Sequence, residues 1–286
     1  MVSGHLWPGR HRPGGVPAGR VGRAGAPGPA LNLLEARGVV RRFGGVVALD
    51  GVDLDVQPGT ITAVIGPNGS GKTTLLNTLS GAYRPQAGRI ALDGHALVGL
   101  RPHRIARLGL ARTFQNIRLF GDLSVLDNVR VGASRGRGST LAAILLGTRA
   151  HRAAEAALTD AAHRALDTVG LSAFAAQRAG SLPYVRQRLL EIARAIAAAP
   201  RLLLLDEPAA GMNMTEAMQL MGLIRGLRDG GLTVVMVEHN MRLVMGVCER
   251  VSVLDFGRRI AEGTPDEIRA DPAVIAAYLG ARRAQR

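Results

Sequence analysis

The chain has 286 residues, of which 47 % are hydrophobic and 3 % aromatic, and its 36 basic residues exceed its 22 acidic ones to give a net charge of +14. This length and apolar fraction predict one or two globular domains and exclude a largely disordered chain. The single cysteine, Cys248, excludes a disulfide within the chain and favours a reducing compartment. No apolar run approaches the ~20 residues of a membrane-spanning helix, so no transmembrane segment is predicted.

The positive charge comes almost entirely from arginine. Lys72 is the only lysine, so arginine supplies 35 of the 36 basic residues. A basic excess is compatible with nucleic acid or an anionic membrane surface as a partner. The arginines are scattered, however, and acidic residues lie among them after residue 31. We interpret the charge as a compositional bias and expect no nucleic-acid partner.

Residues 1–30 differ in composition from the rest of the chain. Glycine and proline fill 13 of these positions, accompanied by four arginines and no acidic residue. Such a segment buries too little apolar surface to offset the entropy of ordering it, and it lacks the apolar stretch of a secretory signal. We predict a disordered tail, either genuine or introduced by a start site placed upstream, followed by one folded domain over residues 31–286.

Short apolar segments that alternate with helical ones predict a parallel sheet. Residues 52–56 alternate apolar side chains with aspartates, which is the period of a half-buried strand. Residues 60–65 form an apolar run that ends in glycine, and a helical segment follows at 73–79. Further buried strands are predicted at 202–205, 233–237 and 251–254. Strands separated by helices in this way predict an α/β fold with both faces of the sheet covered.

Two segments depart from this alternation. Residues 88–97 carry an Asp-Gly pair between apolar stretches, which predicts a β-hairpin. Residues 101–199 show helical periodicity, notably at 151–169, and no strand is expected there. We therefore predict a helical subdomain, roughly 101–199, inserted between two strands of the sheet.

Residues 66–73 match the phosphate-binding pattern G-x-x-x-x-G-K-[ST] between a predicted strand and a predicted helix. Glycines let backbone N–H groups point at phosphate oxygens, and the helix N-terminus adds its positive dipole end. Lys72 is placed to reach the β and γ phosphates, and the Thr73 hydroxyl to bind Mg²⁺. The predicted nucleotide-binding residues of this segment are Gly66, Pro67, Asn68, Gly69, Ser70, Gly71, Lys72, Thr73 and Thr74.

Two carboxylates end the predicted strand at 202–205. Asp206 and Glu207 lie at its C-terminal end, which is the ligand-binding edge of an open α/β sheet. Asp206 is therefore the candidate metal ligand. Glu207 is the candidate group that orients or deprotonates an attacking water.

From about residue 33 to residue 280 the chain resembles the ATP-binding-cassette (ABC) ATPases, and within them the subgroup that serves branched-chain amino-acid import. The resemblance depends on the phosphate loop and on the segments 111–120, 191–194, 206–211, 238–239 and 260–280. It implies a P-loop NTPase fold with a mixed core sheet, a small antiparallel β subdomain and an inserted α-helical subdomain. It also implies ATP and Mg²⁺ as ligands.

The resemblance assigns roles to single residues. Phe43 matches the aromatic residue that stacks on adenine, and Gln115 matches the glutamine that joins Mg²⁺ and water to the membrane partner. His239 matches the switch histidine that contacts the γ phosphate. Thr73, Gln115 and Asp206 then form the predicted metal site, and Glu207, His239 and Gln115 the catalytic set. Gly211 and Asn213 fall in the loop expected at the dimer interface.

The signature segment departs from the family pattern. Relatives carry close to Leu-Ser-Gly-Gly-Gln, which binds the γ phosphate held by the opposite subunit. Val185 replaces the glycine that allows close backbone approach, so its β-branched side chain is expected to crowd the ligand. Arg186 replaces glutamine and offers a positive charge instead. The residues expected to form the signature are Leu182, Pro183, Tyr184, Val185, Arg186 and Gln187.

Three hypotheses follow. The first is an active ATPase subunit that dimerises head to tail around two ATP molecules and drives a separate membrane permease. The second is a nucleotide-binding subunit whose Val185 weakens hydrolysis, so that it relies on a partner ATPase. The third is a soluble ABC protein acting on nucleic acid, which the charge favours but the single cassette and the segment 262–280 oppose.

The resemblance also implies a setting for the first hypothesis. The expected partners are integral-membrane permease subunits, a second ATPase subunit of the same or a different kind, and, indirectly, an extracytoplasmic solute-binding protein. The expected location is peripheral, at the cytoplasmic face of the cell membrane.

Overall fold

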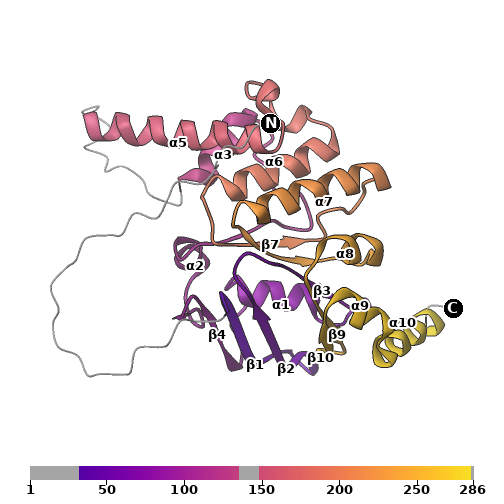
Figure 1. The fold of residues 1–286 in the computed structure, drawn as a ribbon. Coiled ribbons are helices and arrows are strands. Elements are labelled where there is room, and N and C mark those ends of the chain that lie inside the picture. Colours follow the sequence, from indigo (N-terminus) through magenta and orange to yellow (C-terminus); the bar gives the residue numbers. More distant parts are fainter. Residues whose placement is uncertain (1–31, 135–147, 285–286) are drawn as a thin grey trace, which may run out of the picture.

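A computed structural model describes residues 32–134 and 148–284 as two sheets with helices around them (Figure 1). The predicted tail at 1–30 lies outside the described residues. The larger sheet has the strand order β10-β9-β3-β8-β7-β6. Its strands are β3 (Ile61–Ile65), β6 (Leu110–Arg112), β7 (Leu202–Asp206), β8 (Thr233–Val237), β9 (Arg250–Asp255) and β10 (Arg258–Gly263).

This core sheet is mixed. The pairs of β3 with β8 and β9, of β7 with β8, and of β6 with β7 are parallel, whereas β10 runs antiparallel to β9. The strands predicted from buried apolar runs all lie in it. The order carries the C-terminal ends of β3 and β7 to one edge, separated by β8.

The second sheet is small and antiparallel, with the order β2-β1-β4-β5. Its strands are β1 (Leu34–Phe43), β2 (Val46–Val56), β4 (Ala87–Leu92) and β5 (His95–Ala96). The predicted hairpin at 88–97 is confirmed, since β4 and β5 pair across Asp93 and Gly94. Both turn residues have positive φ, 50° and 76°, as a tight hairpin turn with right-handed strand twist requires.

Helices cover both faces of the core sheet. They are α1 (Lys72–Leu79), α2 (Pro102–Arg107), α3 (Val125–Ala133), α5 (Arg149–Thr168), α6 (Tyr184–Ile196), α7 (Met214–Asp229), α8 (Met241–Val247), α9 (Pro265–Ala270) and α10 (Pro272–Ala284). Two short 3-10 turns, η1 (Ser172–Phe174) and η2 (Ala179–Ser181), lead into α6. Figure 1 shows α1 between the antiparallel strands and the core sheet, with α6 and α7 on the opposite side.

Strand β7 shows why the sequence of a central strand is an uninterrupted apolar run. Leu203 and Leu205 pack into the core shared with α6 and α7, whereas Leu202 and Leu204 pack into the second core around α1. Because successive side chains alternate between faces, a strand that is covered on both sides must be apolar throughout. All five residues of β7 are buried, including Asp206 at its end.

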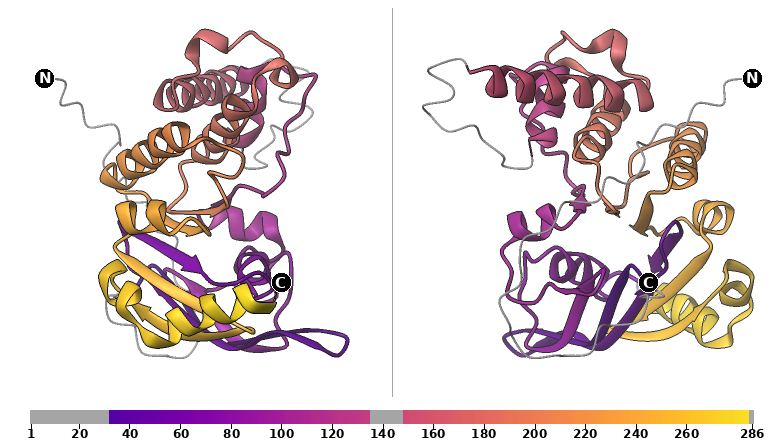
Figure 2. Two further views of the ribbon diagram at one scale, coloured as in Figure 1. Left: turned by 90° about the vertical axis from the view of Figure 1, so that its right-hand side faces the viewer. Right: turned by 60° about the vertical axis from the view of Figure 1, so that its left-hand side comes forward.

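The segment 101–199 is mainly helical, but the expectation that it holds no strand was wrong. Residues 110–112 form β6, which pairs in parallel with β7 at the edge of the core sheet. A strand of three residues is too short to show an alternating pattern, so only the pairing reveals it. Figure 2 shows α3, α5 and α6 gathered at one end of the molecule, above the sheets. The domain boundaries at 31–286 and roughly 101–199 stay predictions.

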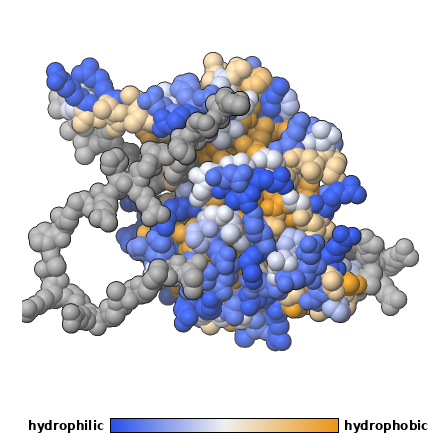
Figure 3. Space-filling model, in the orientation of Figure 1, coloured by the Kyte–Doolittle hydropathy of each residue, from blue (hydrophilic) through white to orange (hydrophobic). Residues whose placement is uncertain are grey.

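The surface agrees with these layers. On the face seen in Figure 3, hydrophilic residues dominate over the antiparallel sheet, and hydrophobic residues show between the upper helices. Within the described part of the chain, no helix has the length and apolar character needed to cross a membrane.

Candidate nucleotide site

The loop after β3 adopts a conformation that only glycine tolerates at two of its positions. A Cβ at Gly66 would lie 2.0 Å from the Leu254 carbonyl oxygen, and a Cβ at Gly71 would lie 2.5 Å from the Ala48 carbonyl oxygen. Both residues also have positive φ, 148° and 103°. Gly69 has φ 79° and open space where a Cβ would be. The two ends of the loop, at Gly66 and Gly71, therefore pack closely against neighbouring backbone, whereas its middle, at Gly69, has free space around it.

Lys72 is folded back into this loop. Its Nζ donates to the carbonyl oxygens of Gly66 and Pro67, both at 2.8 Å, and lies 3.4 Å from Ser70 Oγ. Burial lowers the pKa of Lys72, and the carboxylates of Glu207 and Asp206 oppose that shift. A buried ammonium held by neutral carbonyl and hydroxyl oxygens is placed to exchange them for the stronger acceptors of an anion.

Asp206 lies at the C-terminal end of β7, nearly excluded from solvent. Its Oδ2 accepts a hydrogen bond from Arg112 Nη2 at 3.0 Å, whereas its Oδ1 is buried and has no hydrogen-bond partner. Burial raises the pKa of Asp206, and the hydrogen bond from Arg112 opposes that shift. A buried carboxylate oxygen without a hydrogen-bond donor destabilises the folded protein unless a cation binds it. The site therefore fits a metal ion that binds through oxygen.

The remaining metal ligands must come from elsewhere. Within residues 32–134 and 148–284, no group of three or more histidine, cysteine, aspartate or glutamate side chains is arranged to hold a metal. A hard cation such as Mg²⁺ keeps water and phosphate oxygens as ligands and needs only one or two carboxylates from the protein. The single orphaned oxygen of Asp206 matches that requirement.

Glu207 is contacted by both residues that were expected to act with it. Gln115 Nε2 donates to Glu207 Oε2 at 3.1 Å, and His239 Nδ1 lies 4.0 Å from Glu207 Oε1. Glu207 has φ 47°, an uncommon conformation for a residue with a side chain. Strained residues of this kind concentrate at functional sites. The three predicted catalytic residues are thus brought together.

Glu238 is a residue whose contribution sequence reasoning missed. Its buried carboxylate accepts hydrogen bonds from the backbone N–H of Ala209 at 3.1 Å and of His239 at 3.2 Å. It therefore ties the loop that follows Glu207 to the segment that carries His239. Burial raises the pKa of Glu238, and these backbone donors oppose that shift. Its position before His239 was the only signal in the sequence.

Phe43 ends β1 in an aromatic cluster. Its ring meets the edge of Tyr83 at a centroid distance of 5.2 Å and an interplanar angle of 74°. The Arg41 guanidinium lies 4.4 Å from the centroid of Phe43. Phe43 stays partly exposed, so ring surface is available to a base.

The predicted signature residues surround the start of α6. Pro183 is the residue before the helix, and no side chain caps its N-terminus. Free N–H groups at a helix start attract an anion. Gln187 Nε2 donates to the Leu182 carbonyl oxygen at 2.8 Å, and the Arg186 guanidinium stacks 4.1 Å from the Phe174 centroid. In this structure the Arg186 guanidinium is therefore engaged with Phe174.

Tyr184 joins this helix to the loop after Glu207 within the same chain. Its hydroxyl donates to the Ala210 carbonyl oxygen at 3.0 Å and accepts from Arg188 Nε at 3.2 Å. Arg188 in turn donates to the backbone oxygens of Phe114 and Gln115. A Cβ at Gly211 would lie 3.1 Å from the Tyr184 ring and would press on it, and the φ of 77° also favours glycine at this position.

Asn213, the other residue expected in the dimer loop, caps α7. Its side chain accepts from the Glu216 N–H at 3.0 Å, and the Glu216 carboxylate accepts in return from the Asn213 N–H at 3.0 Å. This reciprocal capping fixes where the loop ends.

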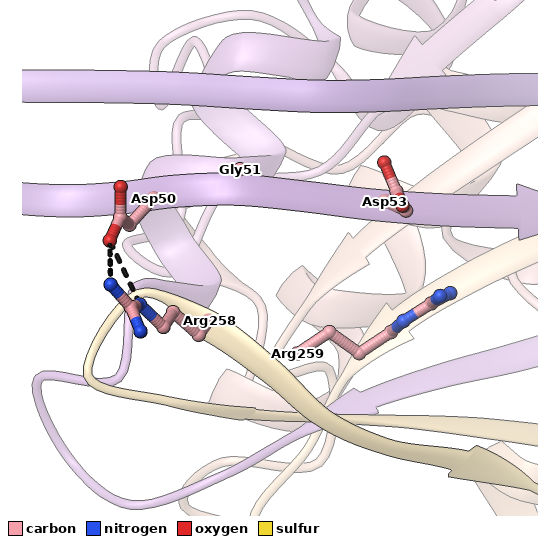
Figure 4. A pocket seen from close by; sticks show the side chains of 5 residues that line it. All are labelled: Asp50, Gly51, Asp53, Arg258 and Arg259. Carbon is pink, nitrogen blue, oxygen red and sulfur yellow. Dashed lines mark hydrogen bonds and ion pairs between the residues drawn. The ribbon is translucent and has the colours of Figure 1, made fainter.

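Two hollows lie outside the phosphate loop. One, of about 220 Å³, lies between the loop that follows Glu207 and the His239 segment. The other, of about 380 Å³, lies between β2 and β10 and is lined by Asp50, Gly51, Asp53, Arg258 and Arg259 (Figure 4). Arg258 is bonded to Asp50 and Arg259 to Glu262, so the arginines of the second hollow are already paired.

Comparison with known proteins places this geometry in a family. A family model described as ABC transporter matches residues 49–210, and one described as branched-chain amino acid ATP-binding cassette transporter matches residues 258–284. The chain therefore belongs to the ABC transporter family, which confirms the resemblance of its sequence to that family.

Several relatives match along most of the chain. It is 45 % identical over 249 residues to the high-affinity branched-chain amino acid transport ATP-binding protein BraF of Pseudomonas aeruginosa. The aligned residues make up 87 % of this chain and 98 % of BraF. The chain is 43 % identical over 249 residues, with the same coverage, to the corresponding protein LivG of Escherichia coli K12.

Solved structures confirm the predicted fold. An ATP-binding cassette of an ABC transporter in its ADP conformation superposes with a TM-score of 0.77 at 30 % identity, covering 88 % of this chain and 100 % of that one. A nucleotide-free cassette gives a TM-score of 0.75 at 30 % identity, covering 86 % and 98 %.

Proposed function

We propose that this protein is the ATP-binding subunit of an ABC importer and hydrolyses MgATP to drive uptake of branched-chain or related amino acids. The observation that carries the proposal is the setting of Glu207. It follows the metal-binding candidate Asp206, accepts a hydrogen bond from Gln115 and faces His239. The candidate catalytic carboxylate, the candidate metal ligand and the switch histidine therefore meet at the edge of the sheet where α/β folds bind ligands.

The residues have distinct roles in this proposal. Lys72 and the N–H groups of the phosphate loop bind the β and γ phosphates, and Phe43 stacks on the base. Asp206 and Thr73 hold Mg²⁺, with Gln115 as a further ligand, and the bound ion neutralises developing charge on the phosphates. Glu207 orients the attacking water and accepts its proton at the carboxylate. His239 contacts the γ phosphate.

Hydrolysis in this proposal requires two subunits arranged head to tail. The uncapped N-terminus of α6 then faces the γ phosphate bound by the other subunit. Closure around two ATP molecules excludes bulk solvent, retains the attacking water and commits hydrolysis. Gly211 and Asn213 lie in the loop that meets the partner. The partner is a second copy or a related ATPase subunit.

The transported solute is inferred from two matches. The model for branched-chain amino acid cassettes covers the segment at β10, α9 and α10, and the relatives named BraF and LivG are branched-chain amino acid transport proteins. Both support membrane permease subunits as direct partners and an extracytoplasmic solute-binding protein as an indirect one. They also support a peripheral location at the cytoplasmic face of the membrane.

Val185 favours a second candidate function. It lies half-buried in the first turn of α6, where the family pattern has glycine. If its side chain crowds the phosphate, the protein binds ATP but depends on a partner's intact signature for turnover. A comparison of hydrolysis between wild type and Val185→Gly separates the two candidates.

Reconstitution tests the proposal directly. The protein is placed in vesicles together with the permease subunits and the solute-binding protein that co-purify with it, and the ATPase site faces the ATP supply. We expect leucine transport that requires ATP and is abolished by Lys72→Ala, because that variant loses the phosphate-binding charge. Transport that is equal in both would contradict the proposal. Specific retention on DNA or RNA at physiological salt, unchanged by removal of residues 1–30, would favour a nucleic-acid role instead.

A further inference from the structure

Arg112 connects three elements of the nucleotide site. It ends β6, three residues before Gln115, and its side chain is 7 % exposed. Its Nη1 donates to Asn77 Oδ1 at 2.7 Å and to Ser80 Oγ at 2.9 Å, both at the C-terminal end of the phosphate-loop helix α1. Its Nη2 donates to Asp206 Oδ2 at 3.0 Å. One guanidinium thus links β6, α1 and β7.

The hydrogen bond to Asp206 leaves that carboxylate asymmetric. Its side chain is 2 % exposed, with Oδ2 held by Arg112 and Oδ1 lacking a partner. A planar guanidinium anchored at Asn77 and Ser80 has a fixed orientation, so the oxygen that it holds is fixed as well. The free oxygen then has one direction in which to bind a cation.

We propose that Arg112 is a positioning residue for Asp206, holding Oδ2 so that Oδ1 alone is presented to the Mg²⁺ of the bound nucleotide. The proposal rests on the proposed nucleotide site. It adds a residue from β6, whose chain leads directly to Gln115. The strand that leads to Gln115 therefore also sets the orientation of the metal ligand.

A simpler role for Arg112 is to neutralise the negative charge of Asp206 without orienting its carboxylate. Replacing Arg112 with lysine distinguishes these two roles. Lysine keeps the positive charge but cannot hold Asn77, Ser80 and Asp206 with one rigid fork. Arg112→Lys therefore preserves compensation of the buried carboxylate and loses its orientation. It also lowers the risk of misfolding, which is larger for Arg112→Gln because that variant leaves Asp206 buried without its ion pair.

The test measures how strongly Mg²⁺ enhances ATP binding. A fluorescent ATP analogue is titrated into each purified variant in Mg²⁺ and in EDTA, and the ratio of the two affinities is the magnesium gain. We expect the gain to fall at least fivefold in Arg112→Lys and at least tenfold in Arg112→Gln. The affinity in EDTA should stay within twofold of wild type, because the phosphate loop itself is unchanged.

Arg118→Gln is the matched control. The Arg118 guanidinium stacks on the ring of Phe114 at 4.6 Å, as that of Arg112 does at 5.3 Å, but Arg118 is exposed and does not bond Asp206 within the described part of the chain. The control should keep the magnesium gain of wild type. An equal loss in Arg118→Gln would assign the effect to Phe114 and overturn the proposal.

Other outcomes also overturn it. A smaller fall in Arg112→Lys would leave only charge compensation, and an increased gain would show that Arg112 competes with Mg²⁺. Parallel losses in Mg²⁺ and in EDTA would show a purely structural role. If wild type itself does not bind the analogue, the proposed function fails, and the role of Arg112 fails with it.

Discussion

Gln115 donates its side-chain amide to the carboxylate of Glu207 over 3.1 Å, although 92 residues separate them in the chain. Gln115 follows β6 and Glu207 follows β7, and these strands pair in parallel. The contact therefore depends on the pairing of an edge strand with its neighbour. A displacement of the Gln115 loop acts directly on the residue that we propose orients water.

Replacing Gln115 should slow hydrolysis more than it weakens binding. In Gln115→Ala we expect the rate of MgATP hydrolysis to fall about tenfold, below the 10²–10⁴-fold of a group that transfers the proton itself. ATP affinity should change less than threefold. Phosphate release and nucleotide titration check both values. The exposed neighbour Asn116→Ala serves as the control, and an unchanged rate in Gln115→Ala would contradict the role.

Replacing Val185 with glycine should accelerate hydrolysis. The substitution removes a β-branched side chain at the helix start where backbone must approach phosphate. The expected cost in stability is about 1 kcal/mol, because the half-buried side chain is lost and glycine is a poorer helix former than valine. Steady-state hydrolysis and urea unfolding measure the two effects, with Val185→Ala expected to be intermediate. If neither variant is faster than wild type, crowding by Val185 is not the limitation.

The hydroxyl of Tyr184 should contribute measurably to stability. It bonds both the Ala210 carbonyl oxygen and Arg188, so Tyr184→Phe removes two hydrogen bonds while keeping the ring against Gly211. Because water reaches this partly exposed site, we expect a loss of about 1 kcal/mol in the free energy of unfolding. Tyr83→Phe, which keeps the ring contact with Phe43, is the control. Equal stability of Tyr184→Phe and wild type would refute the contribution.

Cys248 should react slowly with thiol reagents in the folded protein. Burial raises the pKa of its thiol to about 12, so at pH 8 only on the order of one thiol in ten thousand is ionised, and the thiolate is the reactive form. Unfolding lowers the pKa to its ordinary range and exposes the sulfur. Alkylation followed by mass spectrometry should be at least about a hundredfold faster in denaturant. Similar rates in the two states would show that Cys248 is accessible.

Features confined to one segment could be predicted from the sequence. The strand, the glycines and the helix around Lys72 follow one another in the sequence. The apolar residues before Asp206 predict a buried strand without knowledge of the strands that pair with it. β1 was not predicted because its arginines and glycine interrupt the alternation of a half-buried strand. β10 was also not predicted as a strand.

Three residues that act through tertiary contacts were assigned no role. Arg112, Arg188 and Glu238 bind partners far away in the chain or backbone groups whose positions only the fold determines. Arg112 lies within a segment that carries the family resemblance, yet nothing local marks it as the partner of Asp206. Arginine is also so frequent in this chain that the presence of an arginine at position 112 does not by itself indicate a role.

The central claim is that this chain hydrolyses MgATP through Glu207, and a comparison of two proteins tests it most directly. Glu207→Gln preserves the shape of the side chain and its neighbours but removes the carboxylate that accepts the proton of water. With the purified protein at saturating MgATP, we predict hydrolysis by wild type at least about a hundredfold faster than by Glu207→Gln, with similar ATP affinity. Hydrolysis by wild type no faster than by the variant would contradict the claim.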